Sequence, residues 1–144
     1  RLSKDSRMLP GGGASQTHLA RHLRAFAPSQ TGREQLAIEA YAAALEIVPR
    51  ALAENSGLDP IDEILAISAA QAADSENGAW IGMDVISGEK VRMDKAGVLD
   101  PLFVARHALA GATEAANSVL RIDDVLWAKQ DAQTPDWQSE MDQD

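Results

Sequence analysis

The sequence predicts a mainly α-helical fold with one small β-hairpin before the last long helix. Apolar residues recur at steps of three and four along most of the chain, which is the spacing of amphipathic helices. Hydrophobic residues make up 45% of the 144 residues, yet the aromatic ones are only three Trp, two Phe and one Tyr. The core must therefore consist of small aliphatic side chains, which suit closely packed helices. Only the stretch 79–93 departs from this period, and its glycine-centred turn indicates the hairpin.

Composition limits the possible partners and compartments. Thirteen basic and 22 acidic residues give a formal net charge of −9, which argues against nucleic acid or an anionic membrane as the main partner. The chain has no cysteine, so it lacks disulfides and thiolate metal ligands, as is typical of cytoplasmic proteins. No apolar run approaches the length of a membrane span, and no signal peptide is evident. Because the sequence opens at Arg1 in mid-pattern, we expect a fragment or a processed piece.

The first element is a turn made by Gly11, Gly12 and Gly13, followed by a helix that Pro28 ends. Glycines let the backbone bend and approach a ligand closely. A helix that begins behind them offers unpaired N–H groups and the positive end of its dipole, which together favour a phosphate. Three consecutive glycines are nevertheless more often an ordinary connector, so the turn alone leaves both interpretations open.

Two histidines, His18 and His22, stand four residues apart on this first helix. That spacing can ligate a metal ion. No third ligand stands nearby in the sequence, and Arg21 and Arg24 flank the pair. A solvated helix face is therefore the better interpretation, and we expect no metal site.

Two further helices follow, over 31–55 and from Asp59 to about Asn77. The first has a regular apolar stripe and contains Pro49, which we expect to bend it; Gly57 is placed to end it. In the second, Asp59 is the expected N-cap and Pro60 the first helical residue. The apolar positions of the two helices are Ile38, Tyr41, Leu45, Val48, Leu52, Ile61, Ile64, Leu65 and Ala69.

The hairpin is predicted from two short runs, 80–86 and 90–93, around a turn in which Gly88 takes a positive φ. It is the only strand signal in the sequence. Asp100 and Pro101 then cap and begin the last helix, which runs to about Lys129. The acidic stretch 131–144 is expected to be disordered, with Trp137 in it, whereas Trp127 is expected to pack locally.

Five segments of the sequence, in order and at family-like spacing, resemble motifs of the group II chaperonins, the family of the thermosome. They read PGGGA (10–14), PRALAENSGLDP (49–60), GMDV..GE (82–89), AGVLDP (96–101), and ATEAA with LRIDDV (112–125). The corresponding family motifs are PGGGA, PRTLAENAGLDP, GLDV..GE, AGVVEP, and ATEAA…LRIDDVI. The resemblance implies that residues 1–130 are the C-terminal portion of a chaperonin equatorial domain, the helical domain that binds nucleotide.

The resemblance also implies the site residues. Gly11, Gly12 and Gly13 would lie against the bound nucleotide, since a side chain there would occupy space that the ligand needs. Asp84 and Val85, in the hairpin strand, would contact the base and ribose; without the resemblance, Asp84 would be interpreted as a solvent-facing strand acid. Where the family often has an acid that hydrogen-bonds the ribose, this chain has Lys95, which can donate to a hydroxyl but cannot accept from it.

The function implied by the resemblance is that of an ATP-dependent chaperonin subunit, which assists protein folding in a double ring with other subunits. Its cofactors would be ATP and magnesium. The magnesium-holding loop and the catalytic aspartate of the family lie upstream of the glycine turn, and unfolded clients bind through other domains. We therefore expect no catalytic or metal residue in this segment and no ATPase activity from it alone. Two alternatives remain: a diverged structural ring subunit that binds nucleotide weakly, and a stand-alone helical interaction module.

Overall fold

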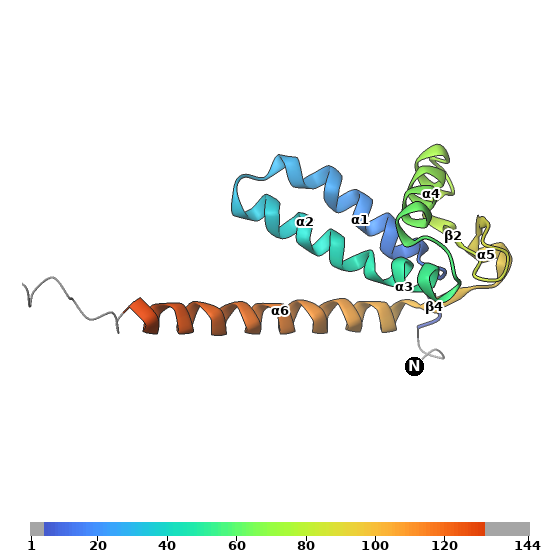
Figure 1. The fold of residues 1–144 in the computed structure, drawn as a ribbon. Helices are drawn as coiled ribbons and strands as arrows, with labels where there is room; N and C mark the ends of the chain where they lie inside the picture. The colour runs from blue at the N-terminus through green and yellow to red at the C-terminus, as the bar shows by residue number, and fades with distance from the viewer. Residues whose placement is uncertain (1–4, 132–144) are drawn as a thin grey trace, which may run out of the picture. The chain divides into compact units, whose positions relative to one another are not determined.

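The computed structural model describes residues 5–131, with the backbone alone for residues 119–131. Helices dominate, and short strands pair in two places (Figure 1). This confirms the predicted mainly α fold with a small hairpin before the last long helix. The elements in order are β1 (Met8–Pro10), α1 (Ala14–Phe26), η1 (Ala27–Ser29), α2 (Arg33–Leu45), α3 (Ile47–Asn55), α4 (Pro60–Ala73), η2 (Gly78–Trp80), β2 (Ile81–Met83), β3 (Lys90–Arg92), α5 (Met93–Ala96), β4 (Leu99–Pro101) and α6 (Leu102–Asp131).

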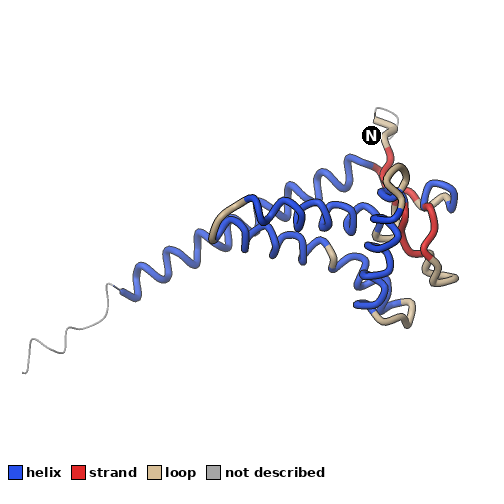
Figure 2. Tube along the Cα trace, turned by 90° about the horizontal axis from the view of Figure 1, so that it is seen from above, coloured by secondary structure: helices blue, strands red, loops and turns tan. Residues whose placement is uncertain are grey.

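Helices α1 and α2 form an antiparallel pair joined by a short connection (Figures 1 and 2). α1 ends at Phe26, and Pro28 lies in the single 3₁₀ turn that follows, as the sequence predicts. The side chains of Ala20, Ala27 and Ala42 are completely buried. Their small size lets the helices approach closely, which is how a chain with few aromatic residues fills this part of its core.

The predicted single helix over 31–55 is wrong, because the chain forms two helices that are interrupted at Glu46. Pro49 has no N–H to give to the carbonyl of Leu45, so the helical ladder breaks one turn before the proline. The ladder resumes when Arg50 N donates to Glu46 O at 3.0 Å. The break is held from the side, because the Arg24 guanidinium of α1 donates to both carboxylate oxygens of Glu46, a residue only 7% exposed.

The connection from α3 to α4 has the two end signals predicted from the sequence. Gly57 has a φ of +75°, and beside it Leu58 N donates to Ala53 O at 2.9 Å, which closes the end of α3. The Asp59 carboxylate accepts from the N–H groups of Ile61 and Asp62 at 2.9 and 3.1 Å and so caps α4. Both predictions are confirmed.

The predicted hairpin is present as β2 and β3, which pair antiparallel with Gly82 opposite Val91. β2 ends at Met83, so Asp84 and Val85 lie at the turn and not in the strand as predicted. Gly88 in its turn has a φ of +74°, as expected. A second antiparallel pair, β1 with β4, places Leu9 opposite Asp100. The sequence did not indicate this pair, because strands of three residues are too short to show an alternating period.

Asp100 and Pro101 belong to β4 and do not begin the last helix, so the predicted cap is wrong. The paired strand extends up to the helix, since Leu102 N donates to Arg7 O at 3.0 Å. Proline is tolerated here because each of these strands has a single partner. On the unpaired edge of a strand, a backbone N–H is not needed for a hydrogen bond to another strand. α6 then begins at Leu102.

The core of the first unit, which ends at Leu102, lies where α3, α4 and β2 meet. Ala53, Ile67 and Met83 are 0–1% exposed there, with Leu52 and Leu58 packed around them. On α4 the buried positions are Ile64, Ile67 and Gln71. Ile61 and Leu65, two of the predicted apolar positions, are each 63% exposed.

The second unit, from Phe103 onward, consists of α6 as far as it is described. The predicted disordered stretch 131–144 lies outside the described residues except for Asp131, which ends α6. The side chain of Trp127 and all of Trp137 also lie outside what the structure describes. None of the described helices is long and apolar enough to cross a membrane.

Replacing Asp59 by alanine is expected to lower the free energy of unfolding by about 1 kcal/mol, because two N–H groups at the start of α4 lose their acceptor. Asp59→Asn keeps a side-chain oxygen in place and is expected to cost only a few tenths of that. Urea denaturation followed by circular dichroism would measure both variants. Equal losses for the alanine and asparagine variants would contradict the assigned cap.

Candidate functional site

The glycine turn is joined by backbone hydrogen bonds to two other parts of the chain. Gly11 N donates to Val98 O at 2.9 Å, in the loop before β4, and Met83 N of the hairpin donates to Gly12 O at 2.9 Å. Gly12 and Gly13 have φ values of +62° and +77°, which residues with a side chain rarely adopt. The structure therefore brings the predicted glycines directly against the strand that leads to Asp84.

The three glycines are needed because protein atoms occupy the positions that their side chains would take. A Cβ atom on Gly11 would lie 2.7 Å from Val98 Cγ1, and one on Gly13 would lie 2.8 Å from Pro49 Cβ. On Gly12 it would lie 2.5 Å from Met93 Sδ and 2.8 Å from Met83 O. Protein atoms therefore fill these Cβ positions; that a bound nucleotide also lies against the turn stays a prediction.

The start of α1, directly behind the turn, has no side chain that competes with an anion. Its N-cap residue is Gly13, which provides no side-chain cap, and its first turn contains no acidic residue. Two side-chain hydrogen bonds stabilise the turn: Thr17 Oγ1 donates to Gly13 O at 2.8 Å, and Ser15 Oγ donates to Pro10 O at 2.8 Å. A helix start of this kind favours a negatively charged group.

Asp84 directs its carboxylate at the hairpin turn. Oδ1 accepts from Ile86 N at 3.0 Å and Oδ2 accepts from Ser87 Oγ at 2.9 Å. These two hydrogen bonds, the one from Ile86 first, hold the pKa of Asp84 below its ordinary value. Because the folded-state pKa is lowered, the stabilisation is present above the ordinary pKa and is lost as pH falls through the lowered one. The next residue, Val85, is 48% exposed and leaves an apolar surface beside the carboxylate.

Lys95 lies on α5, two residues after Met93, whose sulfur faces Gly12. The side chain of Lys95 is exposed. The neighbouring Asp94 is paired with Arg92, whose Nη2 donates to Oδ2 at 2.6 Å, and this bond lowers the pKa of Asp94. The carboxylate nearest to Lys95 in sequence is therefore already engaged by Arg92.

A sequence model of one protein family matches nearly the whole chain, residues 1–130, and the family is the TCP-1/cpn60 chaperonin family. The chain belongs to this family. Among its relatives, the thermosome subunit of Methanocaldococcus jannaschii is 50% identical over 126 residues, which are 88% of this chain and 23% of that protein. Thermosome subunit 1 of Haloferax volcanii is 49% identical over 126 residues, which are 87% of this chain and 22% of that protein.

A solved chaperonin structure has the same fold. The open-state monomer of a group II chaperonin from Methanococcoides burtonii superposes with a TM-score of 0.73 at 39% identity, covering 81% of this chain and 28% of that one. The resemblance drawn from the five motifs is thus confirmed. The chain spans about a quarter of the length of these relatives.

His18 and His22 of this chaperonin chain contact each other, with Nε2 atoms 3.1 Å apart and rings edge to face. The pKa of His18 lies below its ordinary value because burial disfavours the charged ring, and His22 and Arg21 add repulsion. Among the described residues, no group of three or more His, Cys, Asp and Glu side chains is placed to hold a metal ion. A hollow of about 360 Å³ beside them contains none of the predicted nucleotide contacts; it is lined by Arg21, His22, Arg24, Ala25 and Ser68.

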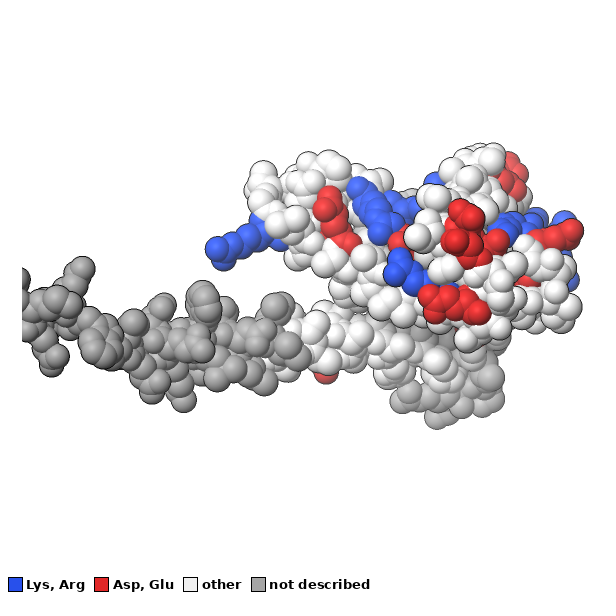
Figure 3. Space-filling view, in the orientation of Figure 1, with Lys and Arg blue, Asp and Glu red and all other residues white. Residues whose placement is uncertain are grey.

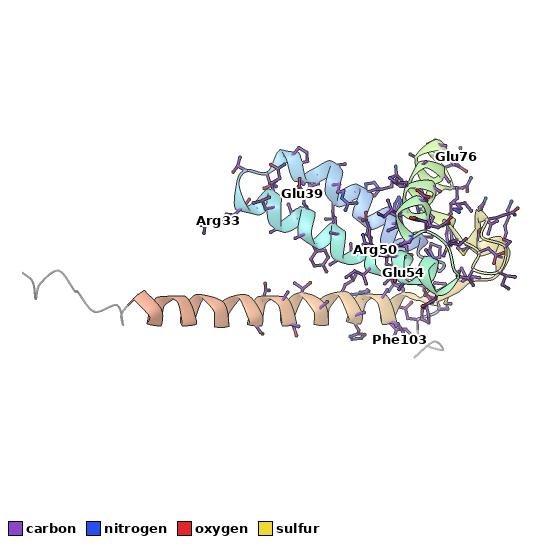
Figure 4. The ribbon with its side chains drawn as sticks, viewed as in Figure 1. Arg33, Glu39, Arg50, Glu54, Glu76 and Phe103 are labelled. Atoms are coloured by element: carbon purple, nitrogen blue, oxygen red, sulfur yellow. The ribbon has the colours of Figure 1, made fainter. Side chains whose placement is uncertain are left out.

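The polar residues of the PRALAENSGLDP motif are also placed by the structure. Arg50 and Glu54 lie one turn apart on α3, where both are exposed (Figure 4). The residue whose hydroxyl satisfies a carbonyl at the end of this helix is Ser56, which donates to Leu52 O at 2.8 Å.

Sequence reasoning missed two residues that shape the site. Gly82 lies so close to the turn that a Cβ atom on it would be 2.9 Å from both Gly11 O and Gly12 O. Gln71 of α4 is 3% exposed, and its amide reaches both α1 and β2. The available signal in the sequence was the four-residue step from Ile67 to Gln71, which places both residues on one helical face. That step alone does not predict a function for Gln71, because its hydrogen-bond partners are distant in sequence.

Gly12→Ala is expected to destabilise the chain more than Gly57→Ala. Both glycines have left-handed backbones, so each variant incurs about 1–2 kcal/mol of strain. A Cβ atom on Gly57 meets nothing within 4 Å, whereas one on Gly12 meets Met83 O and Met93 Sδ. Overpacking should therefore add about 1–3 kcal/mol to the loss at Gly12. Urea denaturation measures both variants, and equal losses would mean that the turn is not packed as described.

Proposed function

We propose that this chain is the C-terminal portion of the equatorial domain, over residues 1–130, of an ATP-dependent group II chaperonin subunit. In the complete subunit it would supply nucleotide contacts and contacts to neighbouring subunits of a double ring that assists protein folding. The observation that carries the proposal is the hydrogen bond from Met83 N to Gly12 O. It joins the glycine turn to the hairpin, so that two segments distant in sequence form one surface.

The phosphates of the nucleotide are proposed to lie at the start of α1. The uncapped helix start and the absence of an acid in the first turn of α1 both favour a negatively charged ligand there. Since the Cβ directions of Gly11, Gly12 and Gly13 are filled by protein, recognition at this turn is by backbone groups. Such contacts are insensitive to which side chains surround them.

The base and ribose are proposed to lie along the hairpin and α5. Val85, exposed beside the turn, offers an apolar surface on which a base can rest. The Asp84 carboxylate, held by Ile86 and Ser87, keeps lone pairs that can accept from a hydroxyl or an amine. Its charge is stabilised by those donors, so it remains an acceptor at neutral pH.

Contacts with further protein are supported by the exposed apolar side chains of the first unit. Leu36 on α2 is 67% exposed, and Ile61 and Leu65 on α4 are each 63% exposed. Large apolar side chains that are this exposed favour a chain that packs against other protein surfaces over a stand-alone module. Lys, Arg, Asp and Glu are interspersed over the face of the first unit in view (Figure 3), which suits neither nucleic acid nor an anionic membrane.

The catalytic parts of the site are proposed to lie upstream of this segment. ATP hydrolysis uses magnesium to neutralise charge that develops on the phosphates. Within the described residues no cluster of metal ligands is present, so we expect the magnesium ligands and the catalytic aspartate in other parts of a cytoplasmic, full-length subunit, along with the surfaces that bind unfolded clients. The 144-residue chain alone should hydrolyse no ATP, and turnover abolished by a substitution within it would contradict this.

A second candidate function is favoured by Lys95. An exposed lysine donates hydrogen bonds but does not accept them, so it cannot take the place of an acid at the ribose hydroxyls. A subunit with this change would keep the fold and its ring contacts while binding nucleotide weakly. The two candidate functions differ only in nucleotide affinity. The first expects the unmodified protein to bind nucleotide as an active subunit does, and the second expects it to bind nucleotide weakly.

Lys95→Glu is expected to strengthen ATP binding by the native protein about tenfold, because a charged acceptor replaces a group that cannot accept from the ribose. Lys95→Ala is the matched control, since it removes the lysine without adding an acceptor and should change affinity little. Isothermal titration with ATP and ADP measures all three proteins. Micromolar binding by the unmodified protein supports an active subunit, and weak binding that Lys95→Glu restores supports the structural subunit. Absence of binding in all three would contradict the proposed nucleotide site.

A further inference from the structure

One face of α4 holds both strands of the hairpin. Glu63, Ile67 and Gln71 stand at successive four-residue steps, which places them along one side of the helix. Glu63 forms an ion pair with Lys90 of β3, and their side chains are 13% and 19% exposed. Ile67 packs in the core with Met83 of β2. The position of the hairpin is therefore set by α4.

Gln71 makes the contact that extends this face to the glycine turn. Its Nε2 donates to Ala14 O at 3.0 Å, the first residue of α1, and to Ile81 O at 2.9 Å, the first residue of β2. One amide group thus uses both of its protons to connect the two segments that carry the predicted nucleotide contacts. The contact lies inside the protein, where it is not weakened by water, because Gln71 is 3% exposed.

The orientation of this amide is determined by its two acceptors. If the amide were turned over, Oε1 would face two carbonyl oxygens, which is repulsive. In the observed orientation both donated bonds are made, and each satisfies a backbone carbonyl of a different segment. A side chain without two donors could not make both contacts.

We propose that Gln71 is a positioning residue for the nucleotide contacts: it holds the start of α1 and strand β2 at the separation that lets the glycine turn and Asp84 act on one ligand. This inference rests on the proposed function. The hydrogen bonds of the Gln71 amide go to Ala14 and Ile81, so its effect on binding would pass through these two residues.

The test compares Gln71→Met and Gln71→Glu in the native protein. Methionine fills a similar volume but donates no hydrogen bond, and glutamate has nearly the same shape with an acceptor in place of the donor. Both variants should weaken ATP binding about tenfold, with glutamate at least as damaging as methionine. Leu45→Val, a buried truncation on α2 and so outside this face, is the control. It should lower the melting temperature and leave ATP affinity unchanged.

A second measurement separates positioning from general loss of stability. Hydrogen–deuterium exchange followed by mass spectrometry should show faster exchange in the peptide containing Met83, whose N–H pairs with Gly12, in both Gln71 variants. Peptides of α2 should exchange as in the unmodified protein. A uniform increase over all peptides, or ATP affinity equal to that of the unmodified protein, would overturn the positioning role alone. Failure of the unmodified protein to bind nucleotide would overturn the proposed function, and the inference with it.

Discussion

The close approach of the glycine turn to strand β2 is the constraint on which the rest of the structure depends. Gly12 accepts a hydrogen bond from Met83, and a Cβ atom at either Gly12 or Gly82 would meet backbone oxygens of the other segment at less than 3 Å. Neither segment is long enough to be stable by itself. The turn, the hairpin and the start of α1 therefore form one unit, which α4 holds from behind through Gln71 and Glu63.

Backbone groups and side chains have different roles in the proposed nucleotide site. In the proposed site the phosphate would meet backbone groups at the start of α1, where Gly13 provides no side-chain cap and the first turn has no acid. Side chains contribute on the hairpin, where Asp84 is fixed by Ile86 and Ser87 before any ligand arrives. A site organised in advance in this way loses little freedom on binding. In the proposed site, a substitution of a surrounding residue, as at Lys95, would change affinity without changing the fold.

Sequence reasoning located several elements whose ends carry a chemical marker, whereas the site residues that share a motif with relatives stay predictions. Gly57, Asp59 and Gly88 act by local backbone chemistry, so their roles could be predicted from neighbouring residues alone. The strand pair β1–β4 and the amide of Gln71 could not, because each depends on a partner distant in sequence. The prediction placed a bend at Pro49 and missed the break at Glu46 for a related reason. The missing N–H of Pro49 removes a hydrogen bond to a carbonyl one turn earlier in the chain.

Photo-crosslinking of the native protein with 8-azido-ATP tests most directly whether the turn and the hairpin form one nucleotide-binding surface. Mass spectrometry of the digested protein would identify the modified residues, with excess ATP as the competitor. We predict that within this chain the label falls on the hairpin and α5, over residues 82–96, and that ATP prevents it. Label that ATP displaces but that lies entirely away from the hairpin and the glycine turn would contradict this account.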